Sequence, residues 1–151
     1  MRQFSEQEKQ LIYAIYQSKD SNSYVLTNAF KEWFYNENNT INTAIGYDCE
    51  HGQLVFDLDK IKDSNSILGI QKEIIQTALL LKYLEDNGLI YIIEDDADTD
   101  NLWYIGKSTQ QMGTPLRVNL PKDIANIINR SKCRIYVSYA LTQLVENDFK
   151  T

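Results

Sequence analysis

The stretch that decides the fold runs from Ile67 to Gly106 and reads ILGIQKEIIQTALLLKYLEDNGLIYIIEDDADTDNLWYIG. Gly88 is expected to end a helix here, because glycine adopts the left-handed cap conformation without a Cβ clash. The segment Leu89–Ile93 then predicts a strand, and Leu102–Ile105 predicts a second strand after the acidic loop Glu94–Asp100. Before Gly88, apolar residues recur at steps of three and four, which places them on one helix face. These residues are Ile70, Ile74, Ile75, Ala78, Leu81 and Leu84.

This order of helix, glycine stop, strand, polar loop and strand resembles the third helix and wing of a winged helix-turn-helix domain. The resemblance covers residues 67–106, and the residues that carry it most closely are Leu81, Leu84, Glu85, Gly88, Leu89 and Ile90. It implies an α+β fold with a winged-helix-like core, in which helices pack on small antiparallel β-hairpins. Another α+β domain in which a helix leads into a hairpin is the alternative interpretation, and neither fold fixes a function.

The rest of the sequence predicts further elements on both sides of this stretch. Capping-box spacing, apolar periodicity and strand-like alternation indicate them. They are a helix from Ser5 to about Ser18 with Glu8 in the capping box, a helix over Tyr24–Tyr35, a hairpin of Ala44–Asp48 with Leu54–Leu58, a strand over Pro115–Leu120, a helix after Pro121, a strand over Arg134–Val137 and a last helix capped by Ser138. We therefore predict a winged-helix-like domain over residues 1–106 and a C-terminal α/β extension over residues 107–151, with one single domain over 1–151 as the alternative.

Charge is distributed unevenly along the chain. The 151 residues carry a net charge of −6, with 18 acidic and 8 basic side chains in residues 1–100 and 3 acidic and 7 basic side chains in residues 101–151. The negative total argues against strong non-specific affinity for nucleic acid. The basic last third indicates either a patch for a partner or a segment that docks on the acidic body, and we favour the second interpretation.

Nothing in the sequence indicates a membrane segment or a secretory route. No apolar stretch approaches the length of a membrane-spanning helix, and the N-terminal MRQFSEQEKQ is polar. Cys49 and Cys133 are too few and too far apart to indicate a disulfide framework, so we expect free, partly buried thiols. We expect a soluble, cytoplasmic protein.

Motifs for catalysis and metal binding are missing or incomplete. The sequence has no phosphate-binding loop, no dinucleotide-binding glycine pattern and no paired-histidine zinc motif. The one histidine, His51, follows Cys49 in what we expect to be a hairpin turn. The spacing of Asp96, Asp98 and Asp100 is that of the start of a calcium loop, but the rest of that pattern is absent. We therefore predict no enzyme activity, no catalytic residue, no metal site and no cofactor.

These residues favour a non-catalytic protein-interaction or regulatory module that uses an acidic wing and an aromatic surface. Tyrosine is abundant, with 10 residues, and tyrosine is enriched at interface hot spots. Carboxylates in the expected wing would repel the phosphates of DNA but attract a basic protein surface. The predicted partner-binding residues are Asp95, Asp96, Asp98, Asp100, Trp103 and Tyr104.

The alternative function is a DNA-binding winged-helix transcriptional regulator with a basic face near the C-terminus. Its predicted nucleic-acid-binding residues are Arg130, Lys132, Arg134 and Tyr136, where basic side chains lie beside a tyrosine. In either case the sequence leaves open which protein or nucleic acid is bound and what the oligomeric state is.

Overall fold

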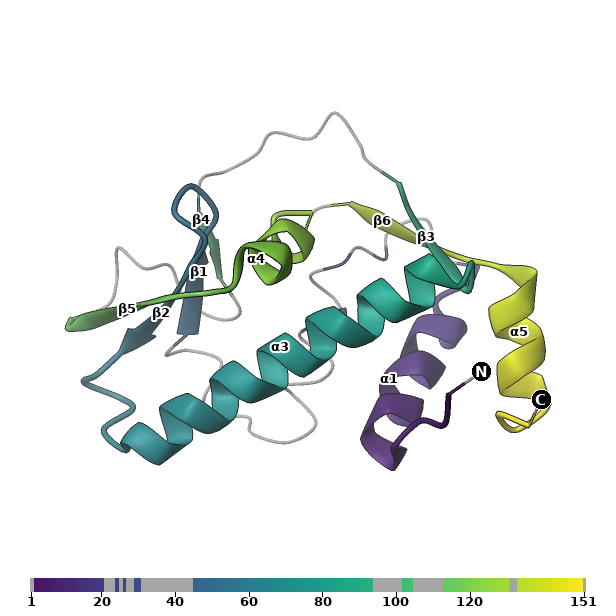
Figure 1. Ribbon diagram of the computed structural model, residues 1–151, viewed down its shortest axis with the longest axis horizontal. Coiled ribbons are helices and arrows are strands. Elements are labelled where there is room, and N and C mark those ends of the chain that lie inside the picture. Colours follow the sequence, from purple (N-terminus) through teal and green to yellow (C-terminus); the bar gives the residue numbers. More distant parts are fainter. Residues whose placement is uncertain are drawn as a thin grey trace.

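The computed structural model describes residues 2–20, 24, 26, 29–30, 45–93, 102–104, 113–130 and 133–150, and of residues 102–104 only the backbone. The fold is α+β, as predicted. In Figure 1 the long helix α3 crosses the molecule, with the larger sheet near its N-terminal half and the smaller sheet, α1 and α5 near its C-terminal half. The elements lie in the order α1 (Glu6–Gln17), β1 (Ile45–Asp48), β2 (Gln53–Asp57), α3 (Ser64–Asp86), β3 (Ile90–Ile93), β4 (Leu102–Tyr104), β5 (Pro115–Asn119), α4 (Lys122–Ile128), β6 (Arg134–Val137) and α5 (Tyr139–Glu146).

Both α1 and α3 begin at a capping side chain. In α1 the predicted capping box is confirmed, because the Ser5 hydroxyl accepts from the Glu8 N–H and the Glu8 carboxylate accepts from the Ser5 N–H. Helix α3 begins earlier than predicted, because the side chain of Asp63 accepts from the Asn65 N–H at 3.0 Å and caps the first turn. The buried stripe of α3 consists of Ile67, Ile70, Ile74, Thr77, Ala78, Leu80, Leu81 and Leu84.

Helix α3 ends at the predicted glycine. Gly88 has a φ of +69°, which only glycine adopts without a steric cost. The N–H groups of Gly88 and Leu89 donate to the carbonyls of Glu85 at 3.0 Å and Leu84 at 2.9 Å. This pair of hydrogen bonds is a Schellman motif, and it turns the chain directly into β3.

Helix α5 ends with the same hydrogen-bond pattern but without a glycine. The N–H groups of Asp148 and Phe149 donate to the carbonyls of Val145 and Leu144. Asp148 has a φ of 55° and Phe149 a φ of 61°. Both lie in the left-handed region, which costs a residue with a Cβ about 1–2 kcal/mol.

The strands on either side of residues 94–101 do not form the predicted wing. The structure has a four-stranded sheet in the order β4-β1-β2-β5 and a separate two-stranded sheet of β3 and β6. The predicted pairing of Leu89–Ile93 with Leu102–Ile105 is therefore wrong. The connection between them is much longer than the two-residue turns that set hairpin register locally. Strand β3 instead meets β6 at the end of α3, where the Ser138 N–H donates to the Leu89 carbonyl at 3.1 Å.

The predicted first hairpin is confirmed. Strands β1 and β2 pair antiparallel, with Asp48 opposite Gln53. Both faces of β2 are buried: Val55 is 0 % exposed and Asp57 is 2 % exposed. The Asp57 carboxylate accepts from the Asp59 N–H at 3.1 Å, which offsets part of the cost of burying it.

The C-terminal third completes both sheets. Strand β5 pairs with β2, and β6 pairs with β3. The predicted strand over Arg134–Val137 and the predicted Ser138 cap are confirmed, because the Ser138 hydroxyl accepts from the Leu141 N–H at 3.2 Å. The division of the chain at residue 106 stays a prediction, although each sheet joins strands from before and after it.

The core lies between α3 and the two sheets, and α1 and α5 close it at one end.

Of the predicted helix over Tyr24–Tyr35, the structure describes Leu26, Ala29 and Phe30 as helical and fully buried, and most of the rest lies outside the described residues. Cys49 and Cys133 are half-buried and are not joined in a disulfide, as predicted. Of the helices that the structure describes, none combines the length and the apolar character needed to cross a membrane.

Candidate interaction surface

The two-stranded sheet has one buried and one exposed face. Side chains alternate along a strand, and Ile90 and Ile135 face the core, where they are 0 % and 7 % exposed. Tyr91 and Tyr136 face the other way, lie directly opposite each other, and are 53 % and 59 % exposed. Their ring centroids are 6.4 Å apart, within the range of a contacting aromatic pair. The exposed side of this sheet therefore carries a pair of tyrosines in contact across the two strands.

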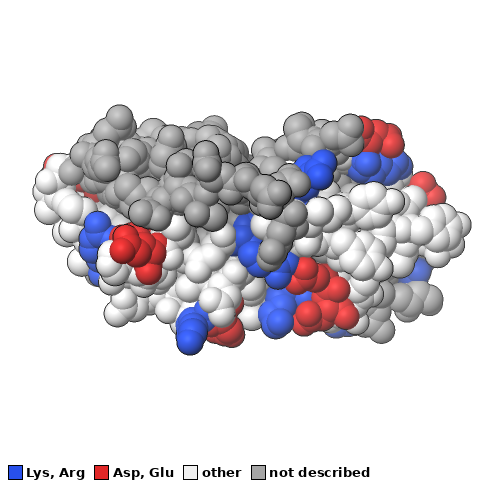
Figure 2. Space-filling model, turned by 90° about the horizontal axis from the view of Figure 1, so that it is seen from above, with Lys and Arg blue, Asp and Glu red and all other residues white. Residues whose placement is uncertain are grey.

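Two further exposed apolar side chains are close to this pair in the sequence. Ile93 lies two residues beyond Tyr91 on the same face, and Tyr139 begins α5 just past the end of β6. We call Tyr91, Ile93, Tyr136 and Tyr139 the tyrosine face. Figure 2 shows the region over β6, β3 and α5, on the right, as largely uncharged. Exposed apolar area of this kind marks contact sites in soluble proteins.

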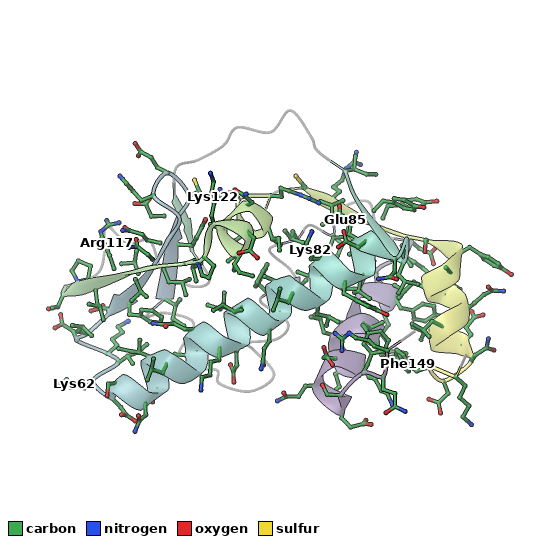
Figure 3. All side chains as sticks on the ribbon, in the orientation of Figure 1. Lys62, Lys82, Glu85, Arg117, Lys122 and Phe149 are labelled. Atoms are coloured by element: carbon green, nitrogen blue, oxygen red, sulfur yellow. The ribbon has the colours of Figure 1, made fainter. Side chains whose placement is uncertain are left out.

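Two arginines of the C-terminal third bind carboxylates of the acidic body. Both terminal nitrogens of Arg130 donate to the carboxylate of Glu85, at 3.2 and 2.5 Å. Arg117 donates to the carboxylate of Asp48 at 2.8 Å. Figure 3 labels Glu85 on α3 and Arg117 on β5. For these two residues, the interpretation that the basic last third docks on the acidic body is confirmed.

The residues predicted to bind a protein partner are described only in part. Asp95, Asp96, Asp98 and Asp100 lie outside the described residues, as do the side chains of Trp103 and Tyr104. The backbone of β4 pairs Trp103 with Tyr47 and Tyr104 with Gly46. Strand β4 therefore belongs to the four-stranded sheet and not to the sheet that carries the tyrosine face.

Of the residues predicted to bind nucleic acid, Lys132 lies outside the described residues. Arg134 and Tyr136 are two residues apart on β6 and so share a strand face, whereas Arg130 is bound to Glu85. Sequence reasoning found Tyr136 but missed Tyr91, because every residue from Leu89 to Ile93 is apolar or aromatic and no alternation shows which side faces water.

A second cluster surrounds the buried carboxylate of Asp48 at the end of β1. Its Oδ2 lies 2.8 Å from both His51 Nδ1 and an Arg117 terminal nitrogen, and its Oδ1 accepts from the backbone N–H groups of Glu50 and His51 at 3.0 and 3.3 Å. Burial alone would raise the pKa of the Asp48 carboxyl, but the hydrogen bonds from His51 and Arg117 outweigh burial and lower that pKa. Asp48 thus ties the hairpin turn to β5.

The Asp48 cluster is better explained as a brace, meaning a structural link between the hairpin turn and β5, than as a metal-binding site. Asp48, Glu50 and His51 each offer one metal-ligand atom within 4.8 Å of the others. The Asp48 oxygen nearest His51 also binds Arg117, however, and a guanidinium at that position repels a cation. Sequence reasoning missed the brace because Asp48 and Arg117 are 69 positions apart.

Two cavities, of about 470 and 640 Å³, lie on either side of Arg2. The Arg2 guanidinium donates to both carboxylate oxygens of Glu8, and this hydrogen bonding lowers the pKa of Glu8. The same guanidinium lies 4.8 Å from the ring centroids of Phe4 and Tyr83. These contacts anchor the N-terminal segment to α1 and α3, so we assign Arg2 a structural role.

No protein-family model matches the chain, and no match was found among curated proteins or solved structures. Its function is therefore inferred from its own residues and their geometry.

Proposed function

We propose that this protein is a non-catalytic protein-interaction module and that the tyrosine face is its contact surface. The observation that carries the proposal is the cross-strand pair of Tyr91 and Tyr136, more than half exposed on a face whose reverse side is core. An exposed pair of this kind leaves two large rings in water, and covering them is favourable by about 25 cal/mol for each Å² buried.

Tyrosine suits such a surface for two reasons. Its ring supplies a large apolar contact with few rotatable bonds, and its hydroxyl keeps the free surface soluble and binds a partner's polar groups. Tyr91, Tyr136 and Tyr139 thus provide the residue type that dominates binding energy at many interfaces. Ile93 adds an aliphatic contact beside them.

The charge of the protein points to a basic partner. The net charge is −6, and Glu94, Asp95 and Asp96 follow Ile93 directly in the sequence. An acidic protein attracts a basic surface, so we propose a partner with a basic contact surface. We expect affinity for a basic partner to fall as salt rises.

The structure gives less support to the DNA-binding alternative. Arg130 already donates two hydrogen bonds to Glu85, and binding a phosphate would require it to leave that carboxylate. The outward side chains of the small sheet also include Tyr91 and Ile93, which are uncharged. DNA binding at Arg130, Lys132, Arg134 and Tyr136 stays a prediction, as does a cytoplasmic location.

Selection from a random peptide library, displayed on phage, tests the proposal. Peptides are selected on the unmodified protein and then compared on three single variants: Tyr91→Ser, Tyr136→Ser and Tyr13→Ser. Tyr13 is the matched control, since it is a similarly exposed tyrosine (49 %) that lies on α1 and contacts Tyr16. We expect the selected peptides to lose at least about tenfold in affinity with either sheet variant, as for a tyrosine hot spot. The control should bind like the unmodified protein.

Two outcomes would count against the tyrosine face. In the first, no peptide is enriched over a blank support. In the second, the enriched peptides bind Tyr91→Ser and Tyr136→Ser as tightly as they bind Tyr13→Ser, which would place the contact elsewhere. Thermal melts of the three variants check that each is folded before affinities are compared.

A further inference from the structure

Strand β5 is the outer strand of the four-stranded sheet. It pairs with β2 on one side, and Figure 1 shows it along the outside of that sheet. Most of the strand is exposed, including the apolar Leu116 at 37 %. Among the residues that the structure describes, none pairs with its other edge. A strand in this position presents unpaired backbone groups to any strand that fits them.

Hydrogen bonds to β2 show which backbone groups of β5 point outward. The Leu58 N–H donates to the Thr114 carbonyl, and the Leu120 N–H donates to the Gly52 carbonyl. Thr114 and Leu120 therefore face β2, and backbone direction alternates along the strand between them. The outward-facing residues are then Pro115, Arg117 and Asn119. Because proline has no N–H, the edge offers the N–H groups of Arg117 and Asn119 and all three carbonyls.

We propose that this edge pairs with the same edge of a second copy of the chain, antiparallel about a two-fold axis at Arg117. In this register the two copies of Arg117 exchange a pair of backbone hydrogen bonds. The Asn119 N–H of each copy donates to the Pro115 carbonyl of the other. Every outward N–H of both strands is then bonded, and proline only has to accept. The pairing is self-complementary, as a two-fold interface must be.

The side chains match in the same register. Leu116 lies opposite Val118 of the other copy, in a closely spaced pair on the core side of the sheet. At one end of β5 the Thr114 hydroxyl donates to the exposed carboxylate of Asp59 at 2.8 Å, and at the other end Lys122 is exposed. The two-fold axis brings each Asp59 to the end that carries Lys122 of the other copy, so opposite charges meet twice.

Arg117 does not oppose this pairing. Figure 3 shows it on β5, and its guanidinium donates to the Asp48 carboxylate, which is 7 % exposed, at 2.8 Å. Each Arg117 therefore brings its own counter-charge to the interface. Proline and a charged residue on an edge strand restrict non-specific pairing. In β5, Pro115 disfavours registers that need a donor at residue 115, and the register centred on Arg117 needs none.

Sedimentation equilibrium tests the inference, with protein from about 5 μM to about 1 mM at about 150 mM NaCl, where the repulsion of net charge is screened beyond about 8 Å. We expect a concentration-dependent dimer.

Asn119→Pro and Asn119→Ala form a matched pair of variants, because both lose the hydrogen bond from the Gln53 side chain and only the proline variant loses the outward N–H. The proline variant should weaken the dimer at least about tenfold, since two intersubunit hydrogen bonds are lost. The alanine variant should stay close to the unmodified protein.

Charge reversal gives a second readout that does not depend on the backbone. Lys122→Glu should weaken the dimer several-fold, and adding Asp59→Lys should restore it. The inference is independent of the proposed function, so Tyr91→Ser and Tyr136→Ser should leave the dimer unchanged. A monomer over the whole concentration range would overturn it. So would a dimer that Asn119→Pro does not weaken relative to Asn119→Ala, or one that the tyrosine variants abolish, since association would then use another surface.

Discussion

Replacing Asp48 tests the side chain that ties the hairpin turn to β5. Asp48→Ala removes the acceptor of two backbone N–H groups in the hairpin turn, at 3.0 and 3.3 Å, each worth about 1 kcal/mol. It also removes the ion pair with Arg117. Because the Arg117 side chain is 46 % exposed, this ion pair contributes only about 0.5–1 kcal/mol to the unfolding free energy. His51 is 59 % exposed and adds little. The total is about 3 kcal/mol of unfolding free energy, or about 6–12 °C in Tm.

The destabilisation caused by replacing Asp48 should change with pH in a definite direction. Folding lowers the pKa of Asp48 below its ordinary value of 3.8. The stability contributed by the ionised carboxylate is therefore complete above that ordinary value and is lost as the pH falls through the lower folded value. Urea unfolding between about pH 7 and pH 2.5 measures the difference in unfolding free energy between the unmodified protein and Asp48→Asn. This difference should be constant above about pH 5 and should shrink below about pH 4. A difference that is negligible at pH 7, or that grows in acid, would refute the brace.

Three further measurements test other parts of the structure. Both Gly88 and Asp148 have positive φ, which favours glycine at each position. In urea unfolding, Gly88→Ala should therefore lower the unfolding free energy by about 1–2 kcal/mol, and Asp148→Gly should raise it by up to about 1 kcal/mol. A double-mutant cycle with Glu85→Ala and Arg130→Ala should give a coupling of about 1 kcal/mol, and independent effects would show that the pair is not formed in solution. Fluorescence anisotropy with mixed-sequence duplex DNA at about 50 and 200 mM salt should show no binding, whereas micromolar binding that is lost at the higher salt would support the regulator alternative.

Local chemistry made several elements predictable. Ser5 and Glu8 specify a capping box within one turn, and Gly88 supplies a conformation that few other residues adopt. Ser138 capped α5 as expected. Each of these inferences needs only residues that are neighbours in the sequence, so the sequence was sufficient.

Pairing between distant strands could not be predicted in the same way. Strand β3 was predicted to turn back onto the strand at Leu102–Ile105, but its partner is β6, in the C-terminal third. All four residues of β3 are apolar or aromatic, so pattern alone did not show that Tyr91 faces water. The exposure of Tyr91 follows from the position of the sheet on α3, a tertiary property. The same holds for Asp48, whose burial depends on strands that pair across the sheet.

The order in which the strands occur in the chain also affects synthesis. Strand β3 leaves the ribosome well before β6, and β2 well before β5, so both sheets wait for residues of the C-terminal third. At about 5–20 residues per second, β3 waits about 2–9 s for its partner strand. During that interval the apolar residues of β3 and the edge of β2 are open to chaperones and to neighbouring chains. The yield of folded protein should therefore depend on the speed of translation from the end of β2 to the end of β6, because one or both sheets lack their last strand while this part of the chain is made.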